Sequence, residues 1–313
     1  MKKLKGQAMK VDEYIELLRS NYFDRYLREG GSAFRLILTD SQRTTQGFES
    51  TLRAKCEKDG AAVILLRSSQ VKLHLIDQLY FGLARSIDWQ SEILKFLDSH
   101  VLVGGGYKTR SGKIDVGPEP DKKDEVIAAI RKTVSSDHSY CAEFRIALTH
   151  LCLSCLTVRG QSMSMHGEVV QQWLRGELSS ITPLKSALIF RKIQRSTARH
   201  MLYSTVQFLR RSGYPYVMLL LDLDRYLDAV SVRSRTIGLY YTFNATMELY
   251  ELLRQAIDDL EKLDGTMVIA MAPHTIVIDE RRGLERYQAL KMRLWNDFRV
   301  KNSQNPLSPM IRL

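Results

Sequence analysis

Cysteine is scarce in this chain, and no apolar run is long enough to span a membrane. Four cysteines among 313 residues argue against a disulfide framework and favour a reducing compartment. The longest apolar runs are interrupted by charge, whereas a spanning helix needs about 20 apolar residues. The basic N-terminal residues are not followed by the apolar segment of a secretion signal. We therefore expect a cytoplasmic protein with no membrane partner.

Acidic residues are fewer than basic ones. The chain has 46 Lys and Arg against 35 Asp and Glu, a net charge of +11. Such an excess favours an anionic partner such as DNA or RNA, but it also serves solubility. The hydrophobic content of 44% and charged content of 26% exclude a disordered chain and predict one large or two ordinary globular domains.

Apolar runs alternate with segments of helical periodicity, which predicts an α/β fold with a mostly parallel sheet flanked by helices. Buried strands are predicted at residues 33–38, 61–69, 215–224 and 265–273. Helices are predicted at 11–27, 46–60, 71–87, 89–100, 125–135, 138–158, 165–175, 195–212, 241–263 and 284–298. Gly, Pro and charge dominate residues 103–124, which predicts a mobile loop. An all-helical insertion over 125–212 follows it, between the second and third strands.

The junction after the first strand stands where a phosphate loop would stand in a nucleotide-binding protein. The template G-x-x-x-x-G-K-[ST] requires glycines, whose backbone lets N–H groups crowd around phosphate, and a lysine that reaches the phosphates. Here Thr39 and Thr44 take the glycine positions, Thr45 the lysine position and Gln46 the hydroxyl position. The candidate residues are Thr39, Asp40, Ser41, Gln42, Arg43, Thr44, Thr45 and Gln46.

A carboxylate ends the third strand. In "YVMLLLDLDRY", Asp222 follows an apolar run, and phosphate-binding α/β proteins use such an aspartate to hold Mg²⁺. Leu223 occupies the place of a water-activating acid, and its side chain cannot accept a proton. Asp224 is the second candidate metal ligand. A buried strand capped by two acids explains the same pattern equally well.

Basic residues gather between residues 191 and 211. Arg191, Arg195 and Arg199 recur every four residues, so a continuous helix would align them in one cationic stripe. Lys192, Arg210 and Arg211 extend the charge. Such a stripe would contact DNA or an acidic partner protein, and the alternative is a solvated helix face.

Three segments carry a family resemblance: "GGSAFRLIL" at 30–38, "WLRGE" at 173–177 and "FRKIQRSTARHMLYSTVQFLRRSGYPYVMLLLD" at 190–222, with "RRGLERYQALKMRLWNDF" in the tail. The chain resembles the ATP-binding domain proteins of bacterial BREX phage-defence systems, a branch of the AAA+-like P-loop ATPases. This resemblance implies a single AAA+-like P-loop NTPase domain over residues 1–313. It also implies other defence-system proteins as partners, including an ATPase homologue.

The resemblance assigns positions to the catalytic parts. Residues 39–46 stand at the phosphate loop, Asp222 at the Mg²⁺ aspartate and residues 270–273 at the sensor, where "AMAP" offers no Asn, Thr or Ser. The candidate finger or sensor arginines are Arg281, Arg282 and Arg286. The chain departs from the family at the loop glycines, the loop lysine, the water-activating acid and the sensor. Joint loss of these groups is hard to reconcile with phosphoryl transfer.

The sequence thus predicts a pseudo-ATPase scaffold or adaptor with no catalytic residue and no cofactor, and DNA as a further partner. Two alternatives stay open. The first is an ATP-hydrolysing enzyme in which Asp40, Asp222 and Asp224 hold Mg²⁺ and Arg43 replaces the lysine. The second is a sequence-tolerant nucleic-acid binder that acts alone.

Overall fold

The computed structural model describes residues 9–103, 108–110, 112–117, 119–158, 160–227, 241–294, 305 and 307–313. The chain forms two compact units. The first unit joins Met1–Leu79 to Pro215–Leu313, and the second is Tyr80–Tyr214.

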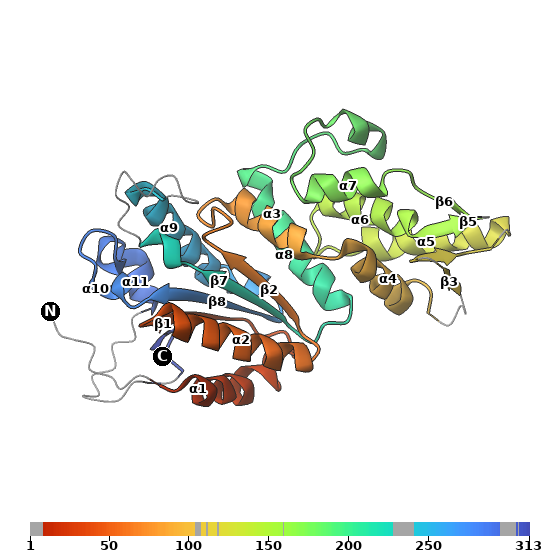
Figure 1. Ribbon diagram of the computed structural model, residues 1–313. Coiled ribbons are helices and arrows are strands. Elements are labelled where there is room, and N and C mark those ends of the chain that lie inside the picture. Colours follow the sequence, from red (N-terminus) through yellow and green to blue (C-terminus); the bar gives the residue numbers. More distant parts are fainter. Residues whose placement is uncertain are drawn as a thin grey trace. The chain divides into compact units, whose positions relative to one another are not determined.

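A parallel sheet forms the centre of the first unit, which confirms the predicted α/β class (Figure 1). Its described strands run in the order β2-β7-β8-β1-β9, and every neighbouring pair is parallel. They are β1 (Ala33–Thr39), β2 (Ala62–Arg67), β7 (Val217–Asp222), β8 (Thr266–Pro273) and β9 (Met310–Arg312). The short strand β9 was not predicted, because three residues carry no readable periodicity.

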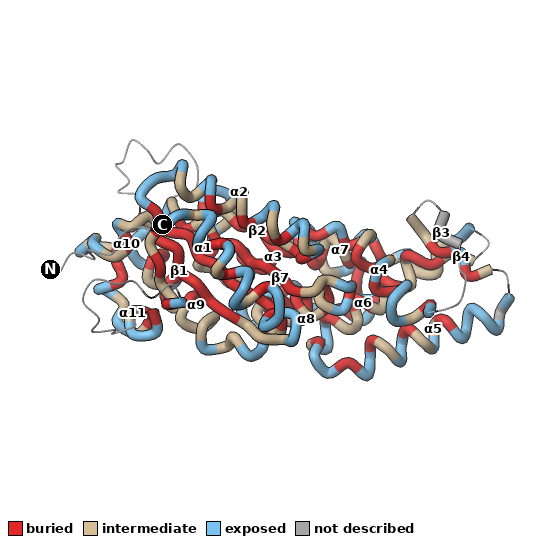
Figure 2. The backbone as a smooth tube through the Cα atoms, turned by 90° about the horizontal axis from the view of Figure 1, so that it is seen from below, coloured by how far each residue is buried: buried red, intermediate tan, exposed pale blue. Residues whose placement is uncertain are grey.

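Burial along the strands follows their place in the sheet. All seven residues of β1 are buried, because β1 lies between β8 and β9 and is covered on both faces (Figure 2). Strand β2 was also predicted to be buried on both faces, and that is wrong: Val63 and Leu65 are only half-buried. The reason is position, since β2 has a described neighbour on one side only.

Helices cover both faces of this sheet, with α1 and α2 on one side and α9 on the other (Figure 1). Tyr14, Phe48 and Leu52 from α1 and α2 pack on Ile37 and Ile269 of the sheet in one apolar cluster. The described helical segments of this unit are α1 (Val11–Leu18), η1 (Arg19–Phe23), α2 (Gln42–Lys58), η3 (Asp224–Tyr226), α9 (Phe243–Asp258), η5 (Leu260–Lys262), α10 (Thr275–Ile278), η6 (Leu284–Arg286) and α11 (Gln288–Leu294). Helix α3 (Ile76–Ser86) crosses the boundary between the units. The last four residues of the helix predicted at 284–298 lie outside the described residues.

The second unit is mostly helical, but it also contains a small sheet. Its helices are α4 (Trp89–His100), α5 (Pro120–Ser135), α6 (Ala142–Ser154), α7 (Gly167–Leu174), η2 (Thr182–Ala187) and α8 (Arg195–Arg211). Its strands pair in the order β3-β4-β5-β6: β3 (Lys108–Arg110), β4 (Lys113–Asp115), β5 (Leu156–Val158) and β6 (Gln161–Ser162). The insertion predicted as all-helical therefore carries two strands, β5 and β6, which are too short to show an alternating pattern.

The segment predicted as a mobile loop, 103–124, is partly regular structure. It contains β3, β4 and the start of α5 at Pro120. Residues 104–107, 111 and 118 lie outside the described residues. Proline at the first turn suits a helix start, because that N–H would be unpaired in any case.

The four cysteines are free thiols: Cys56, Cys152 and Cys155 are buried and Cys141 is half-buried. None of the described helices has both the length and the apolar character required to cross a membrane.

Candidate functional site

The phosphate-loop position is a tight strand-to-helix junction in the first unit. Strand β1 ends at Thr39 and helix α2 begins at Gln42, so only Asp40 and Ser41 lie between them. Ser41 is the N-cap residue, and its Oγ accepts a hydrogen bond from the Thr44 N–H at 3.2 Å. Serine is a favoured cap because its hydroxyl satisfies an orphan N–H of the first turn. The helix therefore starts before the position that the template gives to the second glycine, Thr44.

The backbone N–H groups at the template's glycine and lysine positions both donate to Ser41. Besides the Thr44 contact, the Thr45 N–H donates to the Ser41 carbonyl oxygen at 3.1 Å. The Thr45 hydroxyl lies 2.7 Å from the hydroxyl of Thr39, which is 3% exposed. Thr39, Thr44 and Thr45 therefore form hydrogen bonds with residues of the same strand-to-helix junction.

Asp40 is directed to the edge strand β9. Its carboxylate accepts two hydrogen bonds from the Arg312 guanidinium, at 2.8 and 3.1 Å. These bonds lower the pKa of Asp40. Asp40 is absent from the described lining of the cavity that holds Asp222 and Asp224, so the three aspartates proposed for a Mg²⁺ site do not converge there.

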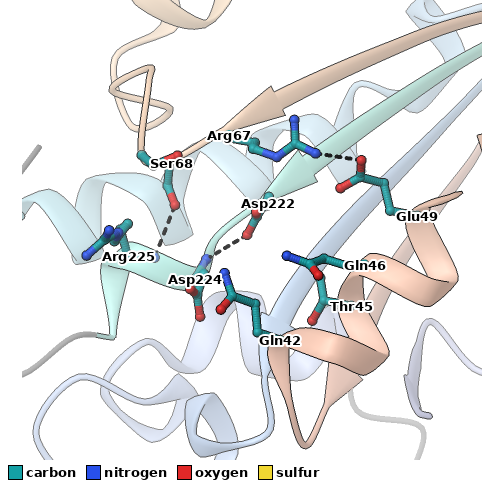
Figure 3. Close-up of a pocket in the computed structure, with 10 residues that line it drawn as sticks. Gln42, Thr45, Gln46, Glu49, Arg67, Ser68, Asp222, Asp224 and Arg225 are labelled. Atoms are coloured by element: carbon teal, nitrogen blue, oxygen red, sulfur yellow. Dashed lines mark hydrogen bonds and ion pairs between the residues drawn. The ribbon is translucent and has the colours of Figure 1, made fainter. Parts of the chain in front are cut away.

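A cavity of about 150 Å³ opens at the carboxyl ends of β2 and β7, beside the first turns of α2 (Figure 3). Ligands of open α/β sheets bind at this edge, where the strands end. The lining residues are Gln42, Thr45, Gln46, Glu49, Arg67, Ser68, Ser69, Asp222, Asp224 and Arg225. Of the predicted candidates, Gln42, Thr45, Gln46, Asp222 and Asp224 meet here. Thr39, Asp40, Ser41, Arg43 and Thr44 do not line it.

Asp222 lies at the end of β7 beside Arg67 of β2, because the parallel register pairs these two residues. Arg67 also makes a 2.6 Å ion pair with Glu49 of α2, whose side chain is 12% exposed. Asp222 Oδ1 accepts a hydrogen bond from the Asp224 N–H at 3.1 Å. Burial raises the pKa of Asp222, while that hydrogen bond and Arg67 oppose the rise. The strand register thus places Arg67 next to Asp222, where its positive charge partly offsets the effect of burial on the carboxylate.

Asp222→Asn is expected to raise the stability of the folded chain at pH 7, by less than about 1 kcal/mol because solvent screens a half-buried carboxylate. The folded pKa of Asp222 is raised, so its favourable contribution is present below the unfolded value of about 3.9 and is lost as pH rises through the folded value. Asparagine stays neutral and can still accept from the Asp224 N–H.

Melting temperatures measured at pH 7.5 and pH 4 test this expectation, and the gain should shrink at the lower pH. Glu49→Gln is the matched control, because it removes the ion pair with Arg67 and should lower the melting temperature. A loss of stability in Asp222→Asn at pH 7.5 would show that the charged carboxylate stabilises the fold.

Leu223 and the end of β8 provide no replacement for a water-activating acid. Leu223 is 1% exposed, and its N–H donates to the Met271 carbonyl oxygen at 2.8 Å.

At the sensor position His274 follows Pro273, and its N–H donates to the Thr39 carbonyl oxygen at 2.9 Å. Burial lowers the pKa of His274, which favours the neutral imidazole. His274 was not among the predicted sensor residues, because it lies one residue beyond the predicted sensor position, residues 270–273. Within the described part of the chain, no three His, Cys, Asp or Glu side chains form a group suited to a metal ion.

The candidate finger or sensor arginines lie apart from the lining of this cavity. Arg282 is structural: its Nη1 donates to the carbonyl oxygens of Tyr226 at 3.3 Å and Tyr241 at 3.2 Å. Arg281 is exposed, and Arg286 donates from Nε to the Glu280 carbonyl oxygen at 2.6 Å.

The predicted cationic stripe does not form as one helix face, because helix α8 begins only at Arg195. Arg191 and Lys192 precede the helix in the segment before its Gln194 N-cap. At the other end, Arg211 makes a 2.9 Å ion pair with Asp137. Arg210 donates to the Tyr214 carbonyl oxygen at 3.0 Å. The stripe is interrupted because residues 188–194, between the 3-10 helix η2 and helix α8, are not helical.

Sequence reasoning also missed Glu49, Arg67, Ser68, Ser69 and Arg225 in the cavity lining. A signal for Arg67, Ser68 and Ser69 was present, since "RSS" directly follows the second apolar run and the carboxyl ends of parallel strands share one edge. Nothing local marks Glu49, which reaches the cavity through the placement of α2.

A family model described as BREX system ATP-binding protein BrxC/D matches residues 119–313, more than half of the chain. The chain belongs to this family. The predicted resemblance is thereby confirmed, and the parallel α/β sheet is consistent with a P-loop NTPase-like fold. Membership of the BrxC/D family indicates a role in a phage-defence system. Comparison with curated proteins and with solved structures gave no match.

Proposed function

We propose that this BrxC/D-family chain is a scaffold or adaptor subunit of a BREX defence complex and does not hydrolyse ATP. One observation carries the proposal. The N–H groups of Thr44 and Thr45, at the positions of the loop glycine and lysine, already donate to Ser41. A phosphate loop needs such N–H groups free to surround the phosphates.

The residues at this edge do not fit a nucleoside triphosphate with its metal ion. No lysine occurs among the cavity-lining residues, and Arg67 is already engaged with Glu49. The cavity of about 150 Å³ is smaller than the roughly 300–1,000 Å³ of ordinary ligand pockets. Asp222 has a guanidinium beside it, and Leu223 cannot activate water.

What the chain retains suits an assembly role. The first unit has a parallel sheet with helices on both faces, and the second unit adds a mostly helical surface. We propose other proteins of the same defence system as partners, including an ATPase homologue that would supply hydrolysis. The proposed location is the cytoplasm, since four free thiols suit a reducing compartment. DNA contact stays a prediction from the net charge alone, because the helical stripe expected to provide it does not form.

The purified chain is expected to bind no ATP with Mg²⁺ in calorimetry at millimolar nucleotide and to show no ATPase activity above the background of a mock purification. The cavity lining holds no lysine, Arg67 is paired with Glu49, and the N–H groups of Thr44 and Thr45 already donate to Ser41. A triphosphate would therefore lack the donors that a phosphate loop supplies.

Asp222→Asn and Arg43→Ala separate this proposal from the alternative of an enzyme with unusual residues. Both variants should behave like wild type in the nucleotide assays. Micromolar ATP affinity with turnover that either substitution abolishes would overturn the pseudo-ATPase assignment.

A further inference from the structure

Three large apolar side chains are exposed within one region of the second unit. Met165 is 92% exposed, Leu188 63% and Phe190 62%. Residues close in sequence to Met165 and Leu188 contact each other: His166 Nε2 lies 2.9 Å from the Ser186 hydroxyl. Phe190 follows two residues after Leu188, in the segment between α7 and α8 (Figure 1).

Leu188 is the single described non-glycine residue with a positive φ, at φ 60 and ψ 25. It caps η2, where its N–H donates to the Lys185 carbonyl oxygen at 3.1 Å. Glycine is the usual residue at such a left-handed cap, because a Cβ is disfavoured there. Leu184 and Ala187, its neighbours in η2, are buried, but the Leu188 side chain is exposed. The fold therefore accepts backbone strain at Leu188 without burying its side chain, a pattern found at functional surfaces.

Basic residues lie close in sequence to Leu188 and Phe190. Lys185, Arg191 and Lys192 are all exposed, and no Asp or Glu occurs between Glu177 and Asp222 in the sequence. Two contacts fix the segment: Trp173 Nε1 donates to the Arg191 carbonyl oxygen at 2.9 Å, and Lys192 Nζ donates to the Ser179 carbonyl oxygen at 2.6 Å. Together Met165, Leu188 and Phe190, with Lys185, Arg191 and Lys192, make up what we call the 165–192 surface.

We propose that the 165–192 surface docks an acidic amphipathic segment of another protein of the same BREX system. Apolar side chains of that segment would cover Met165, Leu188 and Phe190, and its carboxylates would face the basic rim. Exposed Met and Phe beside Arg match the composition of protein interfaces, and charge complementarity would select an acidic partner. Phosphate-backbone binding needs the cations but gains little from three apolar side chains. The inference rests on the scaffold role proposed above and names its docking site.

The variant Leu188→Gly distinguishes an effect on partner binding from an effect on the stability of the fold. Glycine suits the left-handed cap, so the melting temperature should stay unchanged or rise. The variant also removes an apolar contact, so affinity for the partner should fall about 10-fold or more. Met165→Ser should weaken the same interaction. Met292→Ser, at a methionine 77% exposed on α11, is the matched control and should change nothing.

The probes are the other proteins of the same BREX system, purified singly and titrated against the full chain by biolayer interferometry. Binding by at least one of them that Leu188→Gly weakens supports the proposal. Absence of binding to all of them, or a Leu188→Gly variant with wild-type affinity, overturns it. ATP hydrolysis by the chain would refute the pseudo-ATPase assignment, but it would not change the comparison of partner affinity between wild type and Leu188→Gly.

A photoreactive benzoyl-phenylalanine placed at Phe190 in the reconstituted complex identifies the occupant directly. Mass spectrometry should find the crosslink in a segment of the partner that combines Asp or Glu with apolar residues. A crosslink to a second copy of this chain, to added duplex DNA or to anionic lipid vesicles in place of that segment would overturn the assignment.

Discussion

Trp89→Ala is expected to lower the free energy of unfolding by about 3–5 kcal/mol. Trp89 is fully buried in the second unit, and its ring stacks on Phe208 at 5.9 Å between centroids with 17° between planes. Its indole N–H donates to the Ala84 carbonyl oxygen at 2.9 Å. Truncation would leave a cavity between α4 and its neighbours and an unpaired carbonyl, and both terms destabilise.

Urea unfolding followed by circular dichroism measures this loss. Phe190→Ala is the matched aromatic truncation on the same unit, and we expect a change within about 0.5 kcal/mol because Phe190 is 62% exposed. Equal losses in the two variants would contradict the burial assigned to Trp89. A small loss in Phe190→Ala also shows that this side chain does not stabilise the fold, as a docking residue should not.

Arg282→Ala is expected to lower the free energy of unfolding by about 1–3 kcal/mol. The guanidinium donates to the carbonyl oxygens of Tyr226 and Tyr241, whose rings stack at 3.9 Å between centroids. The Tyr250 hydroxyl in turn donates to the Arg282 carbonyl oxygen at 2.6 Å. Removal of the cation leaves two backbone acceptors without their charged donor, and such hydrogen bonds are stronger than neutral ones.

Arg281→Ala and Arg286→Ala are the controls, and both should stay within about 0.5 kcal/mol of wild type because both side chains are exposed. Thermal and urea unfolding of all three variants tests the contrast. A finger arginine would behave in the opposite way, with stability unchanged and nucleotide turnover lost. That outcome for Arg282 would contradict its structural assignment.

In this chain the N–H groups of Thr44 and Thr45 donate to Ser41, and Asp222 pairs in register with Arg67. Both observations support the proposal of a scaffold that does not hydrolyse ATP. The positive φ of Leu188 and its exposed side chain both lie on the 165–192 surface, the proposed docking site. The docking experiment and the nucleotide experiment test these two points separately.

The sequence by itself determined the class of fold and the residue types at the phosphate-loop position. Apolar runs mark four of the five described strands of the large parallel sheet, because helices cover most of the surface of these strands. The absence of glycine and lysine between Thr39 and Gln46 is a matter of residue identity, which no fold can change. Helix periodicity was readable for the longer helices with one buried face, but not for the four-residue helix α10.

Only the tertiary structure decided how the polar groups are paired. Asp40 meets Arg312 across 272 positions of sequence, and Asp222 meets Arg67 because strand order and parallel register bring their strand ends together. Arg282 donates to the carbonyl oxygens of Tyr226 and Tyr241. The four-residue spacing of Arg191, Arg195 and Arg199 did not produce one helix face, because α8 begins at Arg195. Local sequence sets periodicity and cap chemistry, whereas side chains far apart in the chain meet only through the packing of elements, and that information lies in no short segment.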